Sequence, residues 1–345
     1  MMTTRRIVFS LVGSGIACLL LVGMGQAQAP RVFVSINGSD SNPCSAVQPC
    51  RSFNQALTAV EAGGEIVVQS SGGYSTGFTI TQGVTIDAEG VDASVISTSA
   101  TDLCTINTTD RVVLRGISFH GANIGHHAIN VTQVGSLYVE HCSIAEFGGF
   151  GVTMLNGGNL FFTETDVRKC LEGIVLGSGT TGANLVAHDS RFTECVDDGV
   201  LFEANGTGGA SGSISNCTAF LCGAGGFLAE SFTGATVTLA LTNCRAFNTS
   251  NGFFASASNS GGANMVLTNC QALDNTIGIT VEAMGTGNAT VRIANCVVTQ
   301  NSIGLSSSQT GSGLARVIGT SPGSNLIADN SSGNSTGNAA PLVLQ

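Results

Sequence analysis

Short apolar runs alternate along most of the chain with runs of Gly, Ser, Thr and Asn. Within the apolar runs, hydrophobic residues occupy every second position, as in Val237, Leu239 and Leu241, which is the period of a β-strand with one buried face. A glycine marks the same point of each repeat, in steps of 22, 26, 27, 26, 26 and 26 residues. This column is Gly151, Gly173, Gly199, Gly226, Gly252, Gly278 and Gly304. A repeat of this length predicts a solenoid.

One repeat has room for a coil of three short strands and three turns at about 3.3 Å per strand residue. A helical repeat would need an apolar stripe with a period of 3.6 residues, and a leucine-rich repeat would need a fixed leucine framework; the sequence has neither. We therefore predict an all-β, single-domain right-handed parallel β-helix of about ten coils. Equivalent residues of successive coils, about 4.8 Å apart, then form columns.

Several columns carry one type of polar residue. Asparagines at the end of one strand are predicted to form an amide ladder in which each side chain donates to the next coil, and asparagine also tolerates a left-handed turn. Glycine in its own column suits a bend or a position with φ above zero. The predicted ladder consists of Asn216, Asn243, Asn269 and Asn295.

The start of the chain carries short motifs that accompany this repeat elsewhere. They include Phe33-Val34-Ser35, the stretch from Asn37 to Pro43, the stretch from Pro49 to Phe53, and Gly64 to Val68. Together with the repeat, they resemble the pectate-lyase-like superfamily of right-handed β-helices, and within it the broad group of secreted bacterial β-helix repeat proteins. The resemblance covers residues 31 to about 330. It is shared by polysaccharide lyases and by many other relatives, so it implies a fold rather than an activity.

The ends of the chain differ from its regular middle. Residues 1–29 have a charged start, an apolar run and small residues at the end, which predicts a signal peptide and a secreted protein, extracellular or periplasmic. Residues 30–110 are expected to hold an N-terminal cap and irregular first coils, with a helix from Ser52 to Ala62 covering the end of the tube. Residues 111–319 form the regular coils, and residues 320–345 a C-terminal cap and loose tail.

The net charge of the chain limits the classes of partner that it can bind. The chain has 22 acidic and 12 basic residues; without Arg5 and Arg6 of the signal peptide, 22 acids and 10 bases leave a net charge near −12. This disfavours nucleic acid and anionic membranes, and it repels a polyanionic polysaccharide unless a cation bridges the two. No span is expected to cross a membrane in the mature chain, which we expect to be a monomer.

The cysteines fall into two groups. Cys44 and Cys50 lie in a short proline-containing loop of an exported protein, which predicts a disulfide. Most others fall in columns on successive coils, close enough for disulfides, but small buried thiols would also fit there. The sequence leaves both alternatives open for the two columns. They are Cys170, Cys195, Cys222 in one, and Cys217, Cys244, Cys270, Cys296 in the other.

Charged residues gather between residues 140 and 203. A polysaccharide lyase needs a basic residue to remove the proton beside a uronate carboxylate and a cation to neutralise that carboxylate. Lys169 or Arg168 as base, with Asp197 and Asp198 holding Ca²⁺, would fit this outline, and Asp166 lies close by in sequence. The alternative is a surface ladder in which Lys169 offsets the charge of neighbouring glutamates.

Glycoside hydrolysis is a second catalytic option. Carboxylates on adjacent coils would lie about 5 Å apart, a separation suited to retaining hydrolysis. Glu164-Thr165-Asp166 and Asp197-Asp198 resemble the acidic motifs of the polygalacturonase family, but the histidine and the Arg-x-Lys motif that should follow them are missing. That departure weakens the hydrolase hypothesis.

One column combines three side chains that can bind a metal. His141, Glu164 and Asp189 replace the asparagines on three successive coils, so they are either a divalent metal site or polar turn residues. His126 and His127, one coil earlier, are predicted to be surface turn residues. For function we carry two classes: a non-catalytic extracellular or envelope protein with a polysaccharide as candidate ligand, and a polysaccharide-active enzyme, a lyase before a hydrolase.

Overall fold

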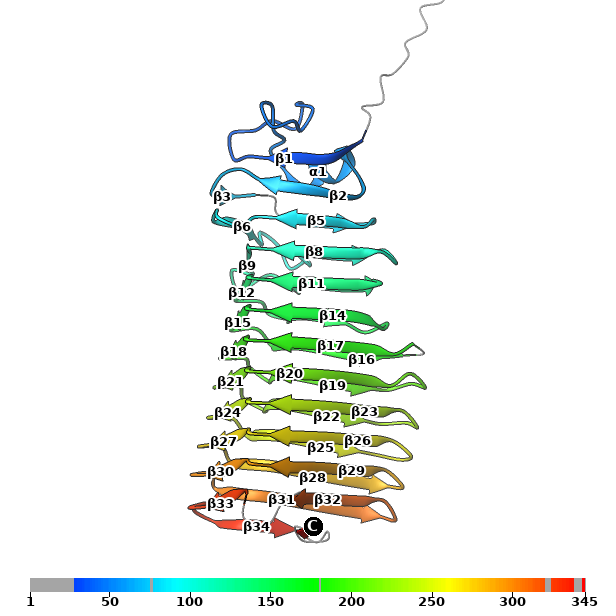
Figure 1. Ribbon diagram of the computed structural model, residues 1–345, viewed down its shortest axis with the longest axis vertical. Coiled ribbons are helices and arrows are strands. Elements are labelled where there is room, and N and C mark those ends of the chain that lie inside the picture. The colour runs from blue at the N-terminus through cyan, green and yellow to red at the C-terminus, as the bar shows by residue number, and fades with distance from the viewer. Residues whose placement is uncertain (1–27, 75–76, 180, 320–323, 338–342, 345) are drawn as a thin grey trace, which may run out of the picture.

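Each regular coil adds one strand to each of three parallel sheets, which we call A, B and C (Figure 1). The computed structural model describes residues 28–74, 77–179, 181–319, 324–337 and 343–344. The predicted signal peptide lies almost wholly outside the described residues. The strands stack along one axis, with the N-terminal coils at one end and the C-terminal coils at the other. The predicted all-β solenoid of stacked coils is confirmed.

Sheet A has thirteen strands and sheets B and C have eleven each, counted over the described residues, and every strand pairs in parallel with its neighbours. Sheet A contains β1 (Ala29–Val34), β2 (Val60–Val68), β5 (Val84–Asp87), β8 (Arg111–Arg115), β11 (Ser136–Glu140), β14 (Gly158–Thr163), β17 (Ala183–His188), β20 (Ala210–Ser215), β23 (Thr236–Thr242), β26 (Gly262–Thr268), β29 (Asn288–Ala294), β32 (Leu314–Gly319) and β35 (Val343–Leu344).

Sheets B and C complete each coil. Sheet B contains β3 (Gly72–Gly73), β6 (Ala93–Ile96), β9 (Ile117–His120), β12 (Ser143–Ala145), β15 (Asp166–Arg168), β18 (Arg191–Thr193), β21 (Thr218–Phe220), β24 (Arg245–Phe247), β27 (Gln271–Leu273), β30 (Val297–Thr299) and β33 (Leu326–Ala328). Sheet C contains β4 (Phe78–Ile80), β7 (Cys104–Asn107), β10 (Ile129–Gln133), β13 (Phe150–Met154), β16 (Glu172–Ser178), β19 (Asp198–Ala204), β22 (Gly225–Ser231), β25 (Asn251–Ala257), β28 (Ile277–Gly285), β31 (Ile303–Gly311) and β34 (Gly333–Gly337).

Each of the two corners beside sheet B contains a residue in the left-handed conformation. The corner from sheet A to sheet B is the column that starts at His141 and ends at Asn295, with φ between 46° and 55° in its seven regular members. The corner from sheet B to sheet C includes Glu146, Lys169 and Glu194. Asparagine adopts this backbone at lower cost than most side chains, which explains its frequency at the first corner.

The amide ladder differs from the prediction. In the corner column of Asn216, Asn243, Asn269 and Asn295 the side chains are exposed, and the only amide-to-amide bond among these four runs from Asn243 Nδ2 to Asn216 Oδ1, at 3.2 Å. A continuous ladder lies instead inside the tube, at the second corner of the last coils. Its members are Asn275, Asn301 and Asn330, joined by amide bonds of 3.0 Å.

The glycines of the repeat column are required for a different reason than the predicted bend or positive φ. None of its seven members has a positive φ. A Cβ added at Gly173 would lie 2.3 Å from the carbonyl oxygen of Gly199, and the same close approach to the next coil occurs along the column. Glycine is needed here because successive backbones pass too close for any side chain.

The N-terminal end is capped as predicted, by a shorter helix. Helix α1 (Phe53–Ala59) begins after Ser52, whose hydroxyl accepts a hydrogen bond from the Gln55 N–H, and Phe53 packs into the core. The helix ends three residues before the expected Ala62 because Val60 is already extended and begins β2. No helix among the described residues is long and apolar enough to span a membrane.

The cysteine prediction is resolved in two parts. Cys44 and Cys50 form a disulfide beside β1. The described cysteines of the columns are free and buried, and burial raises the pKa of thiols such as Cys170, to about 11. They pack as small apolar residues within the tube.

Candidate functional site

The predicted catalytic residues do not converge. Asp166 and Arg168 point outward from β15 on sheet B, where they line a shallow pocket of about 350 Å³ with Arg191. Lys169 occupies the left-handed corner beyond them, and its Nζ lies 3.9 Å from Glu194 Oε2. Both side chains of this pair are about half exposed, at 48% and 52%. This is the surface ion pair of the alternative interpretation.

Asp197 and Asp198 lie past that corner, at the start of sheet C. Among the described residues, no hydrogen bond or ion pair joins either aspartate to Lys169 or Arg168. The expected base and the expected Ca²⁺ ligands are therefore not joined in one site. Asp198 nevertheless belongs to a site, on the outer face of sheet C.

The predicted metal column is only partly assembled. His141 Nδ1 lies 2.8 Å from Glu89 Oε1, and its Nε2 lies 3.5 Å from Glu164 Oε2. Asp189 does not join them, and the three predicted ligands do not form a compact group within the described part of the chain. The side chains are exposed, so this column is a chain of surface contacts.

The outer face of sheet C carries an apolar strip. Val175, Leu201, Leu228 and Phe254 occupy matching positions on the neighbouring strands β16, β19, β22 and β25. Val175, Leu201 and Leu228 are buried although they point away from the tube, because they pack on one another and on Phe150 and Phe254. We call these five residues the apolar strip.

Carboxyl groups border this strip on both sides. Glu172 and Asp198 lie at the start of β16 and β19, on adjacent coils. Glu203 and Glu230 are register partners near the ends of β19 and β22, and Glu282 lies two coils beyond Glu230 in the same column. We call these five residues the acid track.

Three members of the acid track, Glu172, Asp198 and Glu230, have raised pKa values. Burial, together with the charges of Asp198 and Asp197, raises the pKa of Glu172 to about 8. Burial and the charge of Glu230 raise the pKa of Asp198 to about 7, and burial and Glu203 raise the pKa of Glu230 to about 7. Desolvation beside the apolar strip is the largest cause in each case, so several of these groups are protonated near neutral pH.

Three buried polar atoms on this face have no hydrogen-bond partner in the described protein: Glu172 Oε2, Asp198 Oδ1 and Thr153 Oγ1. Thr153 lies on β13, on the outer face beside Val175. An unpaired buried polar group costs about 1–3 kcal/mol. Such costs are seldom retained without a functional reason.

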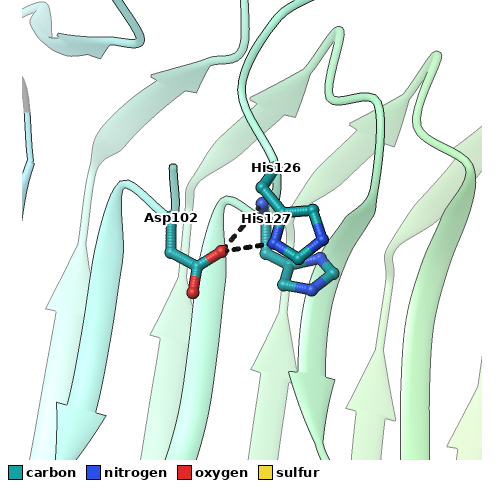
Figure 2. Close-up of side chains that lie close together, drawn as sticks. All are labelled: Asp102, His126 and His127. Atoms are coloured by element: carbon teal, nitrogen blue, oxygen red, sulfur yellow. Dashed lines mark hydrogen bonds and ion pairs between the residues drawn. The ribbon is translucent and has the colours of Figure 1, made fainter. Parts of the chain in front are cut away.

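Two histidines and an aspartate lie at the N-terminal end of the same face (Figure 2). Asp102 Oδ1 is 2.9 Å from His126 Nδ1, and Asp102 Oδ2 accepts a hydrogen bond of 2.7 Å from Asn130 Nδ2 on β10. Burial alone would raise the pKa of Asp102, but the hydrogen bonds from Asn130 and His126 outweigh it and lower the pKa.

His127 precedes the start of β10 and continues the column of Phe150 and Glu172. Its side chain is buried, its Nδ1 accepts a 2.9 Å hydrogen bond from the Phe150 N–H, and its ring stacks on Phe150 at 4.7 Å. Burial, and then the charge of His126, lower the pKa of His127 to about 4. His127 is therefore a neutral, fixed imidazole rather than the surface turn residue that was predicted.

Basic residues are placed elsewhere. No Lys or Arg lies in any strand of sheet C within the described chain, and those present belong to sheet A, sheet B, their corners or the N-terminal cap. Within the described chain, all the charged side chains in the strands of sheet C are therefore acidic. This excludes direct pairing with the carboxylates of a polyanion on this face.

The glycine column contained a signal for most of this site. The residues immediately before glycines of this column include Phe150, Glu172 and Asp198, and His127 occupies the equivalent position one coil earlier. The residues four positions after glycines of this column include Glu203, Glu230 and Glu282. Sequence reasoning gave weight to the corner residues, where charges are dense. It singled out Asp198, as a Ca²⁺ ligand, and missed Glu172, Glu203, Glu230 and Glu282, because single glutamates within apolar runs look like ordinary exposed residues of strands.

Comparison with known proteins identifies the fold. The family model for the right-handed β-helix region matches residues 81–240. No curated protein matches the chain in sequence. A solved structure described as the complex of XylC with xylose aligns at a TM-score of 0.52 and 7% identity, over 84% of this chain and 68% of that one.

Two further solved structures align less closely. The pectate lyase Pel9A has a TM-score of 0.39 and 17% identity, over 92% of this chain and 79% of its own. An alginate lyase from Paenibacillus sp. str. FPU-7 has a TM-score of 0.47 and 14% identity, over 76% of this chain and 94% of its own. Identities this low do not transfer an activity to this chain.

Proposed function

Because the chain folds as a right-handed parallel β-helix, we propose that it binds a polysaccharide along the outer face of sheet C. We further propose that the polymer is uncharged and that the protein meets it outside the cytoplasm, as the predicted signal peptide implies. The observation that supports this proposal is the apolar strip bordered on both sides by the acid track, on a sheet whose described strands contain no Lys or Arg.

Physical chemistry favours a neutral, hydroxyl-rich ligand here. A protonated carboxyl group both donates and accepts hydrogen bonds, as sugar hydroxyl groups do, whereas ionised carboxylates only accept. Val175, Leu201 and Leu228 are buried, so the C–H faces of sugar rings would pack on the partly exposed rings at the two ends of the strip, Phe150 and Phe254. A solenoid repeats these contacts along its axis, which suits a linear polymer.

A matched pair of phenylalanines tests this proposal. Phe254 on β25 lies in the apolar strip, and Phe247 on β24 of the same coil points outward from sheet B, where it stacks on Phe220. The full chain would be titrated with soluble neutral polysaccharides (xylan, mannan and glucans) and with pectate and alginate, by affinity electrophoresis. We expect binding to a neutral polymer, about tenfold weaker in Phe254→Ser, because roughly 1–1.5 kcal/mol of aromatic contact is lost.

The control variant Phe247→Ser should bind as the unchanged protein does. Absence of binding to every neutral polymer, or equal weakening by both substitutions, would overturn the proposal. Preferential binding to pectate or alginate would return the protein to the uronate-specific class expected of a lyase.

One observation favours a catalytic extension of this binding. Glu172 and Asp198 lie on adjacent coils, and the raised pKa of Glu172, about 8, keeps it protonated at neutral pH as a general acid must be. Hydrolysis is thus better supported than β-elimination, since Lys169 is engaged with Glu194 at the corner. Release of reducing ends from the bound polymer, abolished in Glu172→Gln, is the expected result. Release that persists in that variant would exclude Glu172 as the acid.

A further inference from the structure

The cluster of Asp102, His126 and His127 is not needed for the proposed polysaccharide binding. One potential ligand atom from each side chain lies within 4.8 Å of the other two. Figure 2 shows the carboxylate of Asp102 facing the two imidazole rings, whose centroids are 3.7 Å apart. No other group of three His, Cys, Asp or Glu side chains in the described ranges is as compact.

We propose that Asp102, His126 and His127 bind a divalent transition metal ion of the zinc class. Two imidazoles and one carboxylate are a ligand set that such ions take in three-ligand sites. Bond lengths of 2.0–2.1 Å place neighbouring ligand atoms about 3.3 Å apart in a tetrahedral site. The 2.9 Å between Asp102 Oδ1 and His126 Nδ1 is already close to that edge.

The surroundings hold two of the ligands in place. Asp102 is fixed by hydrogen bonds from Asn130 Nδ2 and from the His127 N–H, and the His127 ring is fixed by its stacking on Phe150. Hydrogen bonds that orient a ligating carboxylate are the usual outer shell of a metal site. His126 is 60% exposed in its side chain, so the metal can enter from solvent and keep at least one coordination position for water.

Binding of the metal must change the positions of ring protons and break existing hydrogen bonds in the cluster. The metal takes the place of the proton between Asp102 Oδ1 and His126 Nδ1, and this one proton of neutral His126 moves to Nε2. At His127, ligation through Nδ1 uses the lone pair that now accepts the Phe150 N–H. Ligation through Nε2 moves the ring proton to Nδ1, which also ends that bond. In either case the Phe150 amide loses its partner.

Electrostatics favours a cation at this place. His127 continues the column of Phe150 and Glu172, so the cluster lies at the N-terminal end of the outer face of sheet C, which has no Lys or Arg within the described chain. Among the described residues, no basic side chain on this face repels a divalent ion. The metal proposal is independent of the polysaccharide proposal, since it needs only the three side chains.

The experiment titrates the metal-free full chain with Zn²⁺ by calorimetry, and with Co²⁺ by visible absorption. We expect one Zn²⁺ per chain, bound at least tenfold more weakly in His126→Ala and in Asp102→Asn. The control is His141→Ala, because His141 contacts two glutamates without completing a three-ligand group. Affinity unchanged in that control is part of the expected result.

A second readout separates ligation from a loss of folding. In amide NMR spectra of the unchanged protein, the Phe150 resonance should shift on addition of Zn²⁺, and this shift should vanish in His126→Ala while the other amides of sheet C keep their positions. Absence of Zn²⁺ binding would overturn the proposal, leaving a hydrogen-bonded Asp102 and His126 pair. Binding equally weakened in His141→Ala, or unaffected by His126→Ala, would overturn it as well.

Discussion

The outer face of sheet C and the interior corner of the last coils use polar side chains in opposite ways. In the interior ladder, Asn301 is fully buried, and its amide both donates to Asn330 and accepts from Asn275. On the outer face, Glu172 and Asp198 are also withdrawn from water, yet each has an oxygen atom without a partner. Both regions contain polar groups in apolar surroundings, and only the interior ladder pairs them fully.

The difference separates residues that build the tube from residues available to a ligand. A buried amide stabilises a fold only if its donors and acceptors are used within the protein, and the ladder meets this condition on every coil. The outer face of sheet C bears unpaired polar groups, carboxyl groups with raised pKa values and a continuous apolar strip. That combination lowers the stability of the free protein. We expect it at a site where a bound ligand restores the lost stability.

The largest expected effect comes from breaking the ladder with Asn301→Ala. The amide nitrogen donates to the carbonyl oxygens of Ala272 and Thr299 and to Asn330 Oδ1, while Oδ1 accepts from the amide and the backbone of Asn275. Removing it leaves several buried groups unpaired, so unfolding in guanidinium chloride should show a loss of about 3–5 kcal/mol.

Asn295→Ala is the matched control, since Asn295 is an exposed asparagine of the corner column in the left-handed conformation. Its loss should be about 1 kcal/mol, the cost of a left-handed backbone for alanine. Equal losses in the two variants would contradict the distinction between the interior ladder and the exposed corner column.

The sequence predicted the coil, its strands and the columns, because all three follow from the spacing of glycine and of apolar residues. It placed the asparagine ladder in the wrong column because the two asparagine columns look alike in sequence, and only the inward direction of Asn275 and Asn301 distinguishes them. The pairing of Cys44 with Cys50 was readable because the loop is short.

The site was harder to predict than the fold. Lys169 looked catalytic because it is a lone lysine among acids, but its corner position gives it an exposed partner instead. The raised pKa of Glu172 depends on its desolvation beside the apolar strip and on residues one and two coils away, such as Asp198 and Glu230. The stacking of the coils sets the distances between these carboxyl groups. They cannot be read from the sequence of a single repeat.

The next largest effect concerns the acid track and depends on pH. Folded Glu172 holds its proton to about pH 8, whereas the unfolded chain releases it near 4.5. Between these values the folded state binds more protons, so the free energy of unfolding falls as pH rises. Glu172→Gln removes this penalty and should be more stable than the unchanged protein by about 1–2 kcal/mol at pH 8 and equal to it at pH 4.

Thermal unfolding at pH 4, 6 and 8 measures this difference. Glu194→Gln is the control, because Glu194 is about half exposed at the corner and should give no pH-dependent gain. A Glu172→Gln variant that is less stable at pH 8 would mean that the carboxyl group is ionised and paired in the folded protein. The outer face of sheet C would then resemble the interior ladder, and the contrast between the two regions would fail.

The smallest effect is expected at the corner between sheets B and C, which separates the charged outer face of sheet B from the site on sheet C. In Lys169→Ala the 3.9 Å contact with Glu194 is lost, and because both side chains are about half exposed, the free energy of unfolding should change by less than about 0.5 kcal/mol. Polysaccharide binding and any release of reducing ends should also stay unchanged, since Lys169 lies outside the apolar strip and the acid track. A loss of either in Lys169→Ala, with stability intact, would move the site from the face of sheet C to this corner and revive the lysine as a base.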